Sequence, residues 1–478
     1  MAEGSRLFFY SIKLLEGDTQ VPKRLKLDKN HKDKIERVVR NYESRSQYGD
    51  RETMVADARY SYIEKIVSQT VEKPDLVKDL SVSEKIDRVV TNRFLAIPIF
   101  FVVIFLMFAI TFGPVGESLK GCVEWLFDDV VTPFVSGLLT SANAPEWTHR
   151  LLVDAVIGGV GGIITFLPQI MLLFLCLSVL EDSGYMARAA FIMDRIMRHF
   201  GLSGKSFIPM LMGFGCTTPA VMAARSLENE KDRKLTIMLT PFMSCGAKLT
   251  IYALFAGTFF PENQGIVVFS MYILGMVVAM LSGILLSKTL FRGISSDFVL
   301  ELPQYHIPSV KAIAMRTWDR GKGFLIKAGT VIFSMSVVIW FLQNFSFTFQ
   351  LVDSSADSML GQIGKVIAPI FEPLGFGTWE GAVSLLTGLV AKESVVSTMN
   401  VLYATGTGLS AALNQVFTPL TAYAFMAFTL LYMPCISAFA TIRREMNSVR
   451  WAVGAALYQT GVAYLVSLLI FQIGSLFV

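Results

Sequence analysis

Residues 207–225 read FIPMLMGFGCTTPAVMAAR, residues 226–234 read SLENEKDRK, and residues 235–252 read LTIMLTPFMSCGAKLTIY. The first and third segments are apolar but interrupted by Gly and Pro, and they carry Cys216 and Cys245 near their middles. Within lipid, such a break is tolerated only where the freed backbone groups line a cavity or pack against protein. Interrupted segments are also the best sequence indication of a transporter's binding site. The stretch therefore predicts a membrane transport protein.

The composition separates a polar N-terminal part from an apolar remainder. Hydrophobic residues make up 53% of the 478 residues and charged residues 17%, against about 25% charged in ordinary soluble domains. Residues 1–93 hold 35 of the 80 Lys, Arg, Asp and Glu residues. We therefore predict a cytoplasmic helical segment at 1–93 and a transmembrane domain at 94–478. The net charge of +4 is too slight to indicate nucleic acid.

Apolar periodicity predicts helices throughout. Between Leu7 and Lys73, apolar residues recur three and four apart among charges, which predicts two or three solvated helices. Residues 117–150, with Trp125, Trp147 and two prolines, predict an outer loop with an interfacial helix. Seven segments reach the length of about 20 residues that a bilayer requires. They are residues 94–115, 156–180, 235–259, 266–291, 325–345, 419–441 and 451–476.

The distribution of Lys and Arg predicts the orientation, because cytoplasmic loops carry the excess of basic residues. With residues 1–93 inside, the outer loops hold three basic residues, Lys120, Arg150 and Lys365. The inner loops hold 18, within residues 182–206, 225–234, 288–327 and 442–450. This orientation makes segments 207–224 and 380–403 re-entrant from opposite sides and leaves the C-terminal end outside.

The orientation also reveals an internal repeat of opposite topology. GFGCTTPAVMAAR (213–225) precedes a span with FMSCGAK (242–248), and GLVAKESVVSTMN (388–400) precedes a span with YMPCIS (432–437). Inverted repeats of this kind place a transport site near the midplane. We therefore predict an all-α polytopic membrane protein with two re-entrant or broken helices. Its inverted-repeat halves are expected at about 151–291 and about 322–478.

Three cysteines lie beside the breaks. Cys216, Cys245 and Cys435 occur in GFGCTTP, MSCGA and MPC, whereas Cys122 and Cys176 have no such setting. Thiolates favour softer metals, and mixed sets of thiolate, carboxylate and carbonyl ligands suit borderline ions such as ferrous iron. The alternative is that each Cys is a small apolar packing residue. We predict a metal-binding role for the three cysteines at the breaks.

Glu393 is the second candidate, because an ionisable group within a span is costly and by default marks a pathway. The alternative role is a structural ion pair with Lys392 or Lys248. Met243 and Met433 each precede a candidate Cys by two residues. Their thioethers could assist a soft ion, although Met is often packing material. The predicted metal set is therefore Cys216, Cys245, Cys435, Glu393, Met243 and Met433.

GLSGKS at 201–206 resembles part of a phosphate loop but does not match the full pattern. The pattern G-x-x-x-x-G-K-[ST] requires Gly where His199 stands. The four histidines are scattered and give no zinc spacing. We therefore expect no nucleotide to be bound by this chain.

Several motifs together resemble those of FeoB-type ferrous iron transporters. They are GLSGKSFIPMLMGFGC, SGYMARAAFIMDR, MSCGAKLTIYALFAG, LVAKES and YMPC. The resemblance covers residues 94–478 with two Gate-type segments, and residues 7–73 resemble the end of the family's helical regulatory domain. In the family, cysteines of the corresponding motifs are implicated in iron passage, which implies Cys216, Cys245 and Cys435 here. The family's usual GFGCNVP and SCGARLP read GFGCTTP and SCGAKLT, so roles of that Asn, Arg or Pro do not carry over.

The resemblance implies the permease core of an Fe²⁺ uptake system in the bacterial plasma membrane, with Fe²⁺ as substrate and lipid around it. It also implies a GTPase domain acting in cis or in trans, a small FeoA-like cytoplasmic partner and, as an open point, a homo-oligomer. The sequence contains no GTPase domain, so we expect this chain not to be an enzyme. Alternatives are another divalent metal such as manganese, a Gate-type carrier of nucleosides or protons, and a regulatory partner without transport. A nucleoside carrier would need aromatic and amide groups where these breaks offer Cys, Met and Glu.

Overall fold

The fold is helical throughout the described part of the chain. The computed structural model describes residues 4–18, 20–25, 27–43, 51–71, 82–92, 94–142, 145, 148–149, 151–291, 304–352, 355–403 and 408–476. Within these ranges the only extended pairing is an isolated bridge between Phe345 and Leu351. The chain divides into two units, Met1–Ser81 and Val82–Val478.

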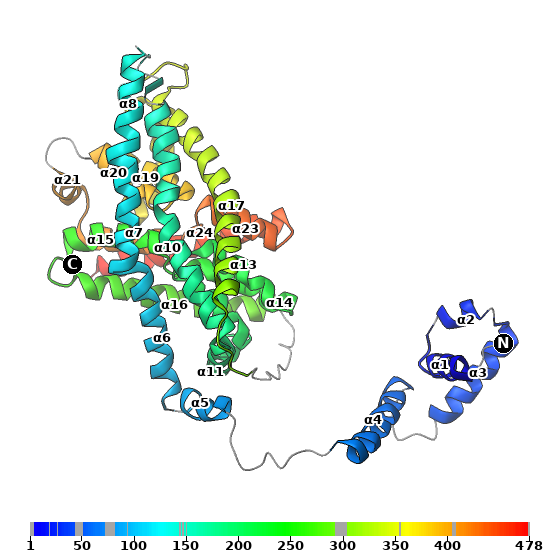
Figure 1. The fold of residues 1–478 in the computed structure, drawn as a ribbon. Helices are drawn as coiled ribbons and strands as arrows, with labels where there is room; N and C mark the ends of the chain where they lie inside the picture. The colour runs from blue at the N-terminus through cyan, green and yellow to red at the C-terminus, as the bar shows by residue number, and fades with distance from the viewer. Residues whose placement is uncertain are drawn as a thin grey trace. The chain divides into compact units, whose positions relative to one another are not determined.

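The described residues of the N-terminal unit form four helices, more than the two or three expected (Figure 1). They are α1 (Gly4–Leu15), α2 (Gln20–Arg24), α3 (Lys29–Glu43) and α4 (Arg51–Thr70). The prediction was wrong because α2 has five residues, too few turns to leave a periodic pattern. Val21 and Val39 are buried while Leu7, Phe8 and Phe9 are exposed, so the unit encloses little apolar core.

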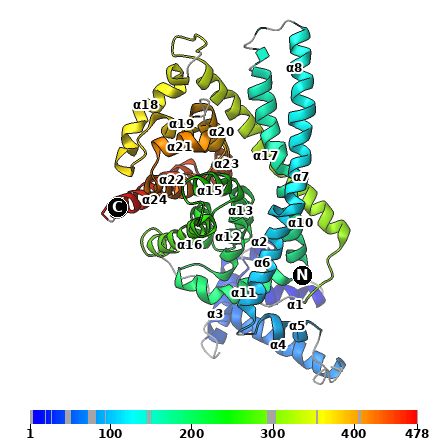
Figure 2. The same cartoon turned by 90° about the vertical axis from the view of Figure 1, so that its left-hand side faces the viewer.

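The second unit, the membrane unit, is a set of long helices around several broken ones (Figures 1 and 2). Its helices are α5 (Val82–Val90), α6 (Ala96–Phe112), α7 (Pro114–Trp125), η1 (Leu126–Val131), α8 (Thr132–Ser141), η2 (Leu151–Ile157), α10 (Gly158–Asp182), α11 (Tyr185–His199), η3 (Gly204–Ser206), α12 (Phe207–Gly213), α13 (Thr217–Ala223), η4 (Ala224–Ser226), α14 (Glu230–Leu239), η5 (Thr240–Phe242), α15 (Gly246–Phe259), α16 (Gln264–Thr289), α17 (Val310–Asn344), η6 (Ser355–Asp357), α18 (Met359–Phe371), η7 (Glu372–Leu374), α19 (Trp379–Val390), α20 (Ser394–Tyr403), α21 (Leu409–Val416), α22 (Pro419–Leu431), α23 (Ile436–Glu445) and α24 (Val449–Gly474).

In the part of the chain that the structure describes, seven helical segments are long and apolar enough to cross a membrane, and each overlaps one of the seven predicted spans. They are Ala96–Ser141, Ile164–Asp182, Glu230–Phe259, Gln264–Thr289, Val310–Asn344, Pro419–Glu445 and Val449–Gly474. The polytopic, all-α prediction is thereby confirmed.

The predicted outer loop after the first span is wrong as far as Ser141. Helices α6, α7, η1 and α8 form one continuous rod, Ala96–Ser141, 46 residues long (Figure 2). Gly113 and Pro114 suggested a stop, but Gly113 is a single extended residue with φ −86° and ψ −160°. Pro114 is the first residue of α7, where the missing N–H costs nothing. The helix is therefore interrupted at one residue, Gly113, and continues as α7 without a loop.

The two broken spans form the centre of the membrane unit. In the segments Glu230–Phe259 and Pro419–Glu445, 67% of the most apolar window is buried, against 6–33% in the other five. Each broken span follows a broken hairpin, α12–α13 in the first case and α19–α20 in the second. Helices α10 and α17 pack on each other, and α22 packs on α24, around this centre.

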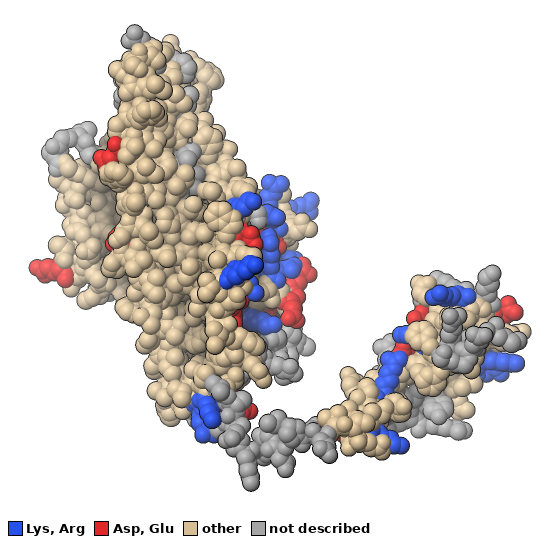
Figure 3. Space-filling model, in the orientation of Figure 1, with Lys and Arg blue, Asp and Glu red and all other residues tan. Residues whose placement is uncertain are grey.

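Charged side chains gather on one flank of the membrane unit. On the membrane unit as drawn in Figure 3, most visible Lys and Arg side chains lie on the flank where Figure 1 labels α14 and α23, while the long helices are nearly free of charge. Both elements belong to loops or helix ends that the basic-residue count places inside. This flank is therefore the expected cytoplasmic face of the membrane unit.

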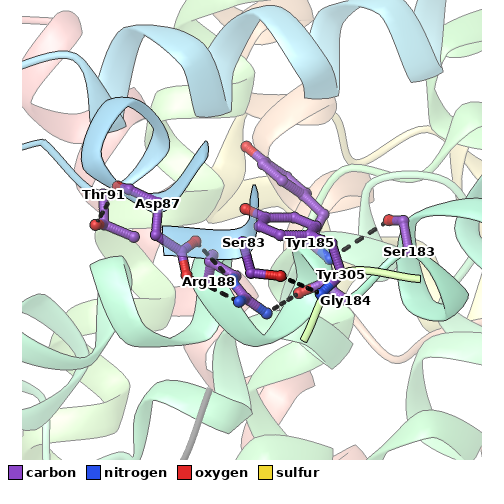
Figure 4. Close-up of polar contacts among 8 residues, drawn as sticks. All are labelled: Ser83, Asp87, Thr91, Ser183, Gly184, Tyr185, Arg188 and Tyr305. Atoms are coloured by element: carbon purple, nitrogen blue, oxygen red, sulfur yellow. Dashed lines mark hydrogen bonds and ion pairs between the residues drawn. The ribbon is translucent and has the colours of Figure 1, made fainter. Parts of the chain in front are cut away.

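Helix α5 is fastened to α11 by a buried charge pair (Figure 4). Arg188, whose side chain is 1% exposed, donates two hydrogen bonds of 2.9 Å to the carboxylate of Asp87. Its guanidinium also donates to the carbonyl of Gly184 and lies 4.1 Å from the ring centre of Tyr305. The backbone N–H of Tyr305 in turn donates to Ser83. One arginine thus joins α5, α11 and the segment before α17.

We expect Asp87→Ala to lower the stability of the membrane unit by about 3 kcal/mol. That is the lower end of the cost of stranding a buried charge, because the Asp87 side chain is 21% exposed. The exposed charge Lys85 on the same helix provides the control, Lys85→Ala, which should cost less than about 1 kcal/mol. Thermal unfolding in detergent and the rate of tryptic cleavage after Arg88 measure the effect. Equal values for the two variants would contradict it.

The pair also predicts a pH dependence. The hydrogen bonds from Arg188 hold the pKa of Asp87 below its usual value. A lowered folded pKa gives stability that is complete above the unfolded pKa, about 3.9, and is lost as the pH falls through the folded value. The melting temperature in detergent should therefore lose no contribution from this pair between neutral pH and about 5, and should lose it only in stronger acid. In Asp87→Asn this acid-dependent loss should be absent.

Candidate transport site

All four breaks border one cavity of about 320 Å³. The lining includes Gly215 to Thr218 between α12 and α13, and Cys245 to Thr250 at the start of α15. It also includes Val390 to Glu393 between α19 and α20, and Pro434, Cys435 and Ser437 at the start of α23. The two broken hairpins and the two broken spans therefore meet at a single space.

Each of the three predicted cysteines occupies the N-cap of the helix after a break. Cys216 precedes α13, Cys245 precedes α15 and Cys435 precedes α23. Their ψ angles of 130°, 163° and 157° show that the chain leaves the helical conformation at each Cys. The first N–H groups of a helix have no intrahelical partner and favour negative charge. The three thiols thus lie beside backbone N–H groups that have no intrahelical partner.

Close contacts hold the breaks against each other. The N–H of Gly246 donates to the carbonyl of Gly215 at 3.2 Å, joining the two breaks of the first half. A Cβ on Gly215 would lie 2.4 Å from Leu173 Cδ2, so any other residue there requires the Leu173 side chain of α10 to move. The hydroxyls of Thr218 and Ser437, 3.2 Å apart, join the first half to the second.

Lys248, which is 2% exposed, donates hydrogen bonds to backbone carbonyls that the helix breaks leave without an intrahelical partner. Its Nζ donates to Pro241 O and Met243 O at 3.0 Å. It also donates to Leu430 O at 2.7 Å, at the end of α22 in the other half. An unpaired carbonyl in an apolar interior is costly, so the single amino group stabilises both broken spans at once.

Lys392 plays the corresponding part in the second half. It is 2% exposed, and its Nζ donates to Met433 O at 3.0 Å. The same Nζ lies 3.1 Å from the ring centre of Tyr432, whose hydroxyl donates to Leu385 O. The break between α19 and α20 is therefore tied to the break between α22 and α23, as Gly215 and Gly246 tie the first pair.

Glu393 lines the cavity with the three cysteines. Among the described residues, no ion pair joins its carboxylate to Lys392 or Lys248, whose amino groups point to carbonyls instead. The structural ion pair considered as its alternative role is not formed. Glu393 thus keeps its charge-bearing group available to the cavity.

Met243 and Met433 differ from the other predicted residues. Neither contributes to the lining of the cavity. Met243 is 3% exposed within the main apolar core and Met433 packs against that core, while their carbonyls accept from the two lysines. In addition, no three His, Cys, Asp or Glu side chains among the described residues are close enough to hold a metal ion together. Cys216, Cys245, Cys435 and Glu393 share a cavity without forming an assembled metal centre.

Sequence reasoning missed the hydroxyl groups of the site. Thr218 and Ser437 line the cavity and contact each other across the two halves. The signal was present, because each stands two residues after a candidate cysteine, in Cys216-Thr-Thr and Cys435-Ile-Ser. The repeat Cys-x-[Ser/Thr] at two corresponding breaks would have identified both.

We expect Lys248→Met to destabilise the protein by about 3 kcal/mol or more, since up to three buried carbonyls lose their donor and each costs about 1–3 kcal/mol. Lys120→Met is the matched control, because Lys120 lines the same cavity but pairs with Glu124 at 3.1 Å in a partly exposed position. The control should change stability by less than about 1 kcal/mol. Thermal unfolding in detergent separates the two. A melting temperature for Lys248→Met equal to that of the control would contradict the role given to Lys248.

These features define a class: a polytopic membrane transport protein with an inverted pair of broken hairpins and broken spans around a central cavity. Three family models match the chain. "Nucleoside recognition" (Gate) matches residues 163–259 and 325–449, "Ferrous iron transport protein B C terminus" matches 268–320, and "FeoB cytosolic helical domain" matches 3–72. The chain belongs to the FeoB family. Its first unit corresponds to the family's cytosolic domain, which places the N-terminal side of α5 in the cytoplasm.

Curated relatives support the same assignment. "Fe(2+) transporter FeoB" of Methanocaldococcus jannaschii is 39% identical over 481 residues, covering 98% of this chain and 70% of the relative. The protein of that name from Staphylococcus aureus (strain MSSA476) is 44% identical over 421 residues, covering 88% and 63%. A "Fe(2+) transport protein A/Fe(2+) transporter FeoB fusion protein" of Porphyromonas gingivalis is 38% identical over 483 residues, covering 90% and 56%. The chain thus spans about two thirds of the length of these relatives or less. No solved structure matches it significantly.

Proposed function

We propose that the chain is the permease core of a ferrous iron uptake system in the bacterial plasma membrane. The observation that supports this most is that Cys216, Cys245 and Cys435, at three separate helix breaks, line one cavity together with Glu393. Thiolates with a carboxylate suit ferrous iron, whereas magnesium and calcium prefer all-oxygen ligands. The names of the relatives point to the same substrate.

The charges of the cavity favour binding that is brief and linked to protons. Lys248 and Lys392 line the cavity with Glu393, so its fixed groups do not by themselves attract a cation. A divalent ion leaving water needs negative ligands, which the thiols supply by releasing protons. The ligands are not preassembled among the described residues. We infer that the ion is held by two or three of them at a time, which keeps its release fast.

We expect serine at Cys216, Cys245 and Cys435 together to reduce Fe²⁺ uptake at least about tenfold, because the hydroxyl keeps the size of the side chain but is a poor ligand for a soft ion. Uptake of radioactive Fe²⁺ into proteoliposomes under anaerobic conditions measures it. Glu393→Gln should lower uptake as well, since it removes the carboxylate that balances the ion's charge.

The matched control is serine at Cys122, which is exposed and outside the cavity. It should transport at the parent rate. Melting temperatures and yields must stay the same in all variants. If the triple variant transports iron like the parent, the cysteines are packing residues, and the pathway must be sought around Glu393 and the broken backbone.

Uptake measurements in the same vesicles distinguish iron from two alternative substrates, a nucleoside and Mn²⁺. The description of the Gate model, nucleoside recognition, favours a nucleoside, and about 320 Å³ reaches the lower limit of small-molecule pockets. Nucleoside uptake without iron uptake would establish that alternative.

Manganese shares the oxygen and nitrogen chemistry of iron but has less affinity for thiolates. Competition between Mn²⁺ and Fe²⁺ in the parent and triple variant separates the two metals.

We further propose that a GTPase domain, in cis or in trans, acts on the permease from the cytoplasmic side. The fusion named for the Porphyromonas gingivalis relative supports a small FeoA-like partner there. This chain has no phosphate loop, since His199 stands where the first glycine is required. We therefore expect the purified chain neither to bind guanine nucleotides at micromolar concentration nor to hydrolyse GTP. Titration with a fluorescent GTP analogue tests this, and saturable binding would contradict it.

A further inference from the structure

A second cavity, of about 570 Å³, adjoins the site. The two cavities share one lining residue, Phe324 of α17. On α10, Leu173 lines the first cavity and its neighbour Phe174 the second. On α13, Thr218 lines the first and its neighbour Pro219 the second. Side chains of three helices, α10, α13 and α17, therefore form a wall between the two spaces.

The centre of this wall is apolar and buried. Phe174 is 3% exposed and Phe324 8% exposed, and the two form one buried cluster. Cys216 packs against that cluster, together with apolar side chains of α10 and α17. An ion leaving the sulfur of Cys216 for the second cavity would therefore meet aromatic rings directly. Hydrophobic constrictions of this kind stop ions because water does not fill them.

The second cavity faces the cytoplasmic side. Its lining includes Lys205, Arg225 and Arg320, which belong to the loops that carry the excess of basic residues. The first cavity extends the other way, to Glu117 and Lys120 of α7.

Two ion pairs join α10 to α17 at the cytoplasmic end of the wall. Arg320 pairs with Glu181 at 2.7 Å, and Arg316 pairs with Asp182. Arg316 and Glu181 are each 51% exposed. Exposed pairs contribute little stability, so they can break and re-form during transport.

We propose that Phe174 and Phe324 form the cytoplasmic gate of the permease, closed in this structure, and that the second cavity is the vestibule through which the ion leaves. Opening requires α17 and α10 to separate at the two rings, with loss of the two ion pairs. The proposal rests on the proposed transport function for the identity of the ion, but the barrier itself is a property of the wall.

The test is the accessibility of Cys216 from the cytoplasmic side. A charged methanethiosulfonate is added to inside-out vesicles containing the chain, and modification of the Cys216 peptide is followed by mass spectrometry. In the parent we expect slow modification. In Phe174→Ala and Phe324→Ala we expect it to be about tenfold faster or more, because removing a buried ring leaves a cavity and weakens the closed packing. The control Phe105→Ala removes a ring that is 71% exposed on α6 and should leave the rate unchanged.

Downhill Fe²⁺ flux in the same vesicles gives the second measurement. Faster modification together with faster flux supports the gate and the function. Faster modification without any flux, in the parent or the variants, supports the gate and overturns the proposed function. Equal modification of Cys216 in the parent, the Ala variants and the control overturns the gate, whatever the flux.

Side chains of graded size at position 324 separate an effect on the gate from an effect of misfolding. Phe324→Leu keeps most of the apolar volume and should give a rate between the parent and Phe324→Ala. Phe324→Trp enlarges the ring and should slow both modification and flux. Melting temperatures show whether each variant is folded. Rates of the folded variants that do not follow the size of the side chain at 324 would overturn the proposal.

Discussion

The structure depends on how the carbonyls freed by its broken spans find hydrogen-bond donors away from water. Lys248 donates to three of them, on two sides of the inverted repeat, and Lys392 donates to one at the other break. Several unpaired carbonyls in lipid would cost more than the net stability of most domains. By donating hydrogen bonds to these carbonyls, the two lysines make the breaks in the spans energetically possible, and the breaks create the cavity.

The use of lysines as donors to the freed carbonyls has an electrostatic consequence for transport. The donors that satisfy the backbone add two amino groups to the wall of a space proposed for a cation, so that three lysines, with Lys120, face Glu117 and Glu393. A site with permanent negative charge would bind a divalent ion tightly and release it slowly. Here the negative charge has to come from thiols, which lose protons only when the ion is present. Positive groups near soft, protonatable ligands suit a permease better than a storage site.

Much of this arrangement could be predicted from the sequence. The seven apolar segments, the two broken hairpins and the convergence of Cys216, Cys245 and Cys435 on one space follow from hydropathy and from Gly and Pro positions. The continuation of α6 into α8 could not, because Gly113 permits either a loop or a kink and packing decides. Nor could the partners of Lys248, which lie 182 positions away at Leu430 as well as nearby. Local patterns show where a helix breaks, but they do not show which distant group satisfies the break.

The relative strength of the contacts indicates which element moves when the cytoplasmic wall opens. Helix α11 lines the second cavity on one side and holds α5 on the other through Arg188, a two-bond contact at 1% exposure. Separating α11 from α5 would strand a buried charge, at several kcal/mol. Helix α17 packs along α10 and shares the buried cluster of Phe174 and Phe324 with it. The ion pairs between the two helices are partly exposed and worth about 1 kcal/mol or less each, and only 6% of the apolar window of α17 is buried, against 33% for α10. Moving α17 away from Phe174 therefore costs apolar contacts but strands no fully buried charge, so we expect α17 to move while α10, α11 and α5 remain together as the fixed wall.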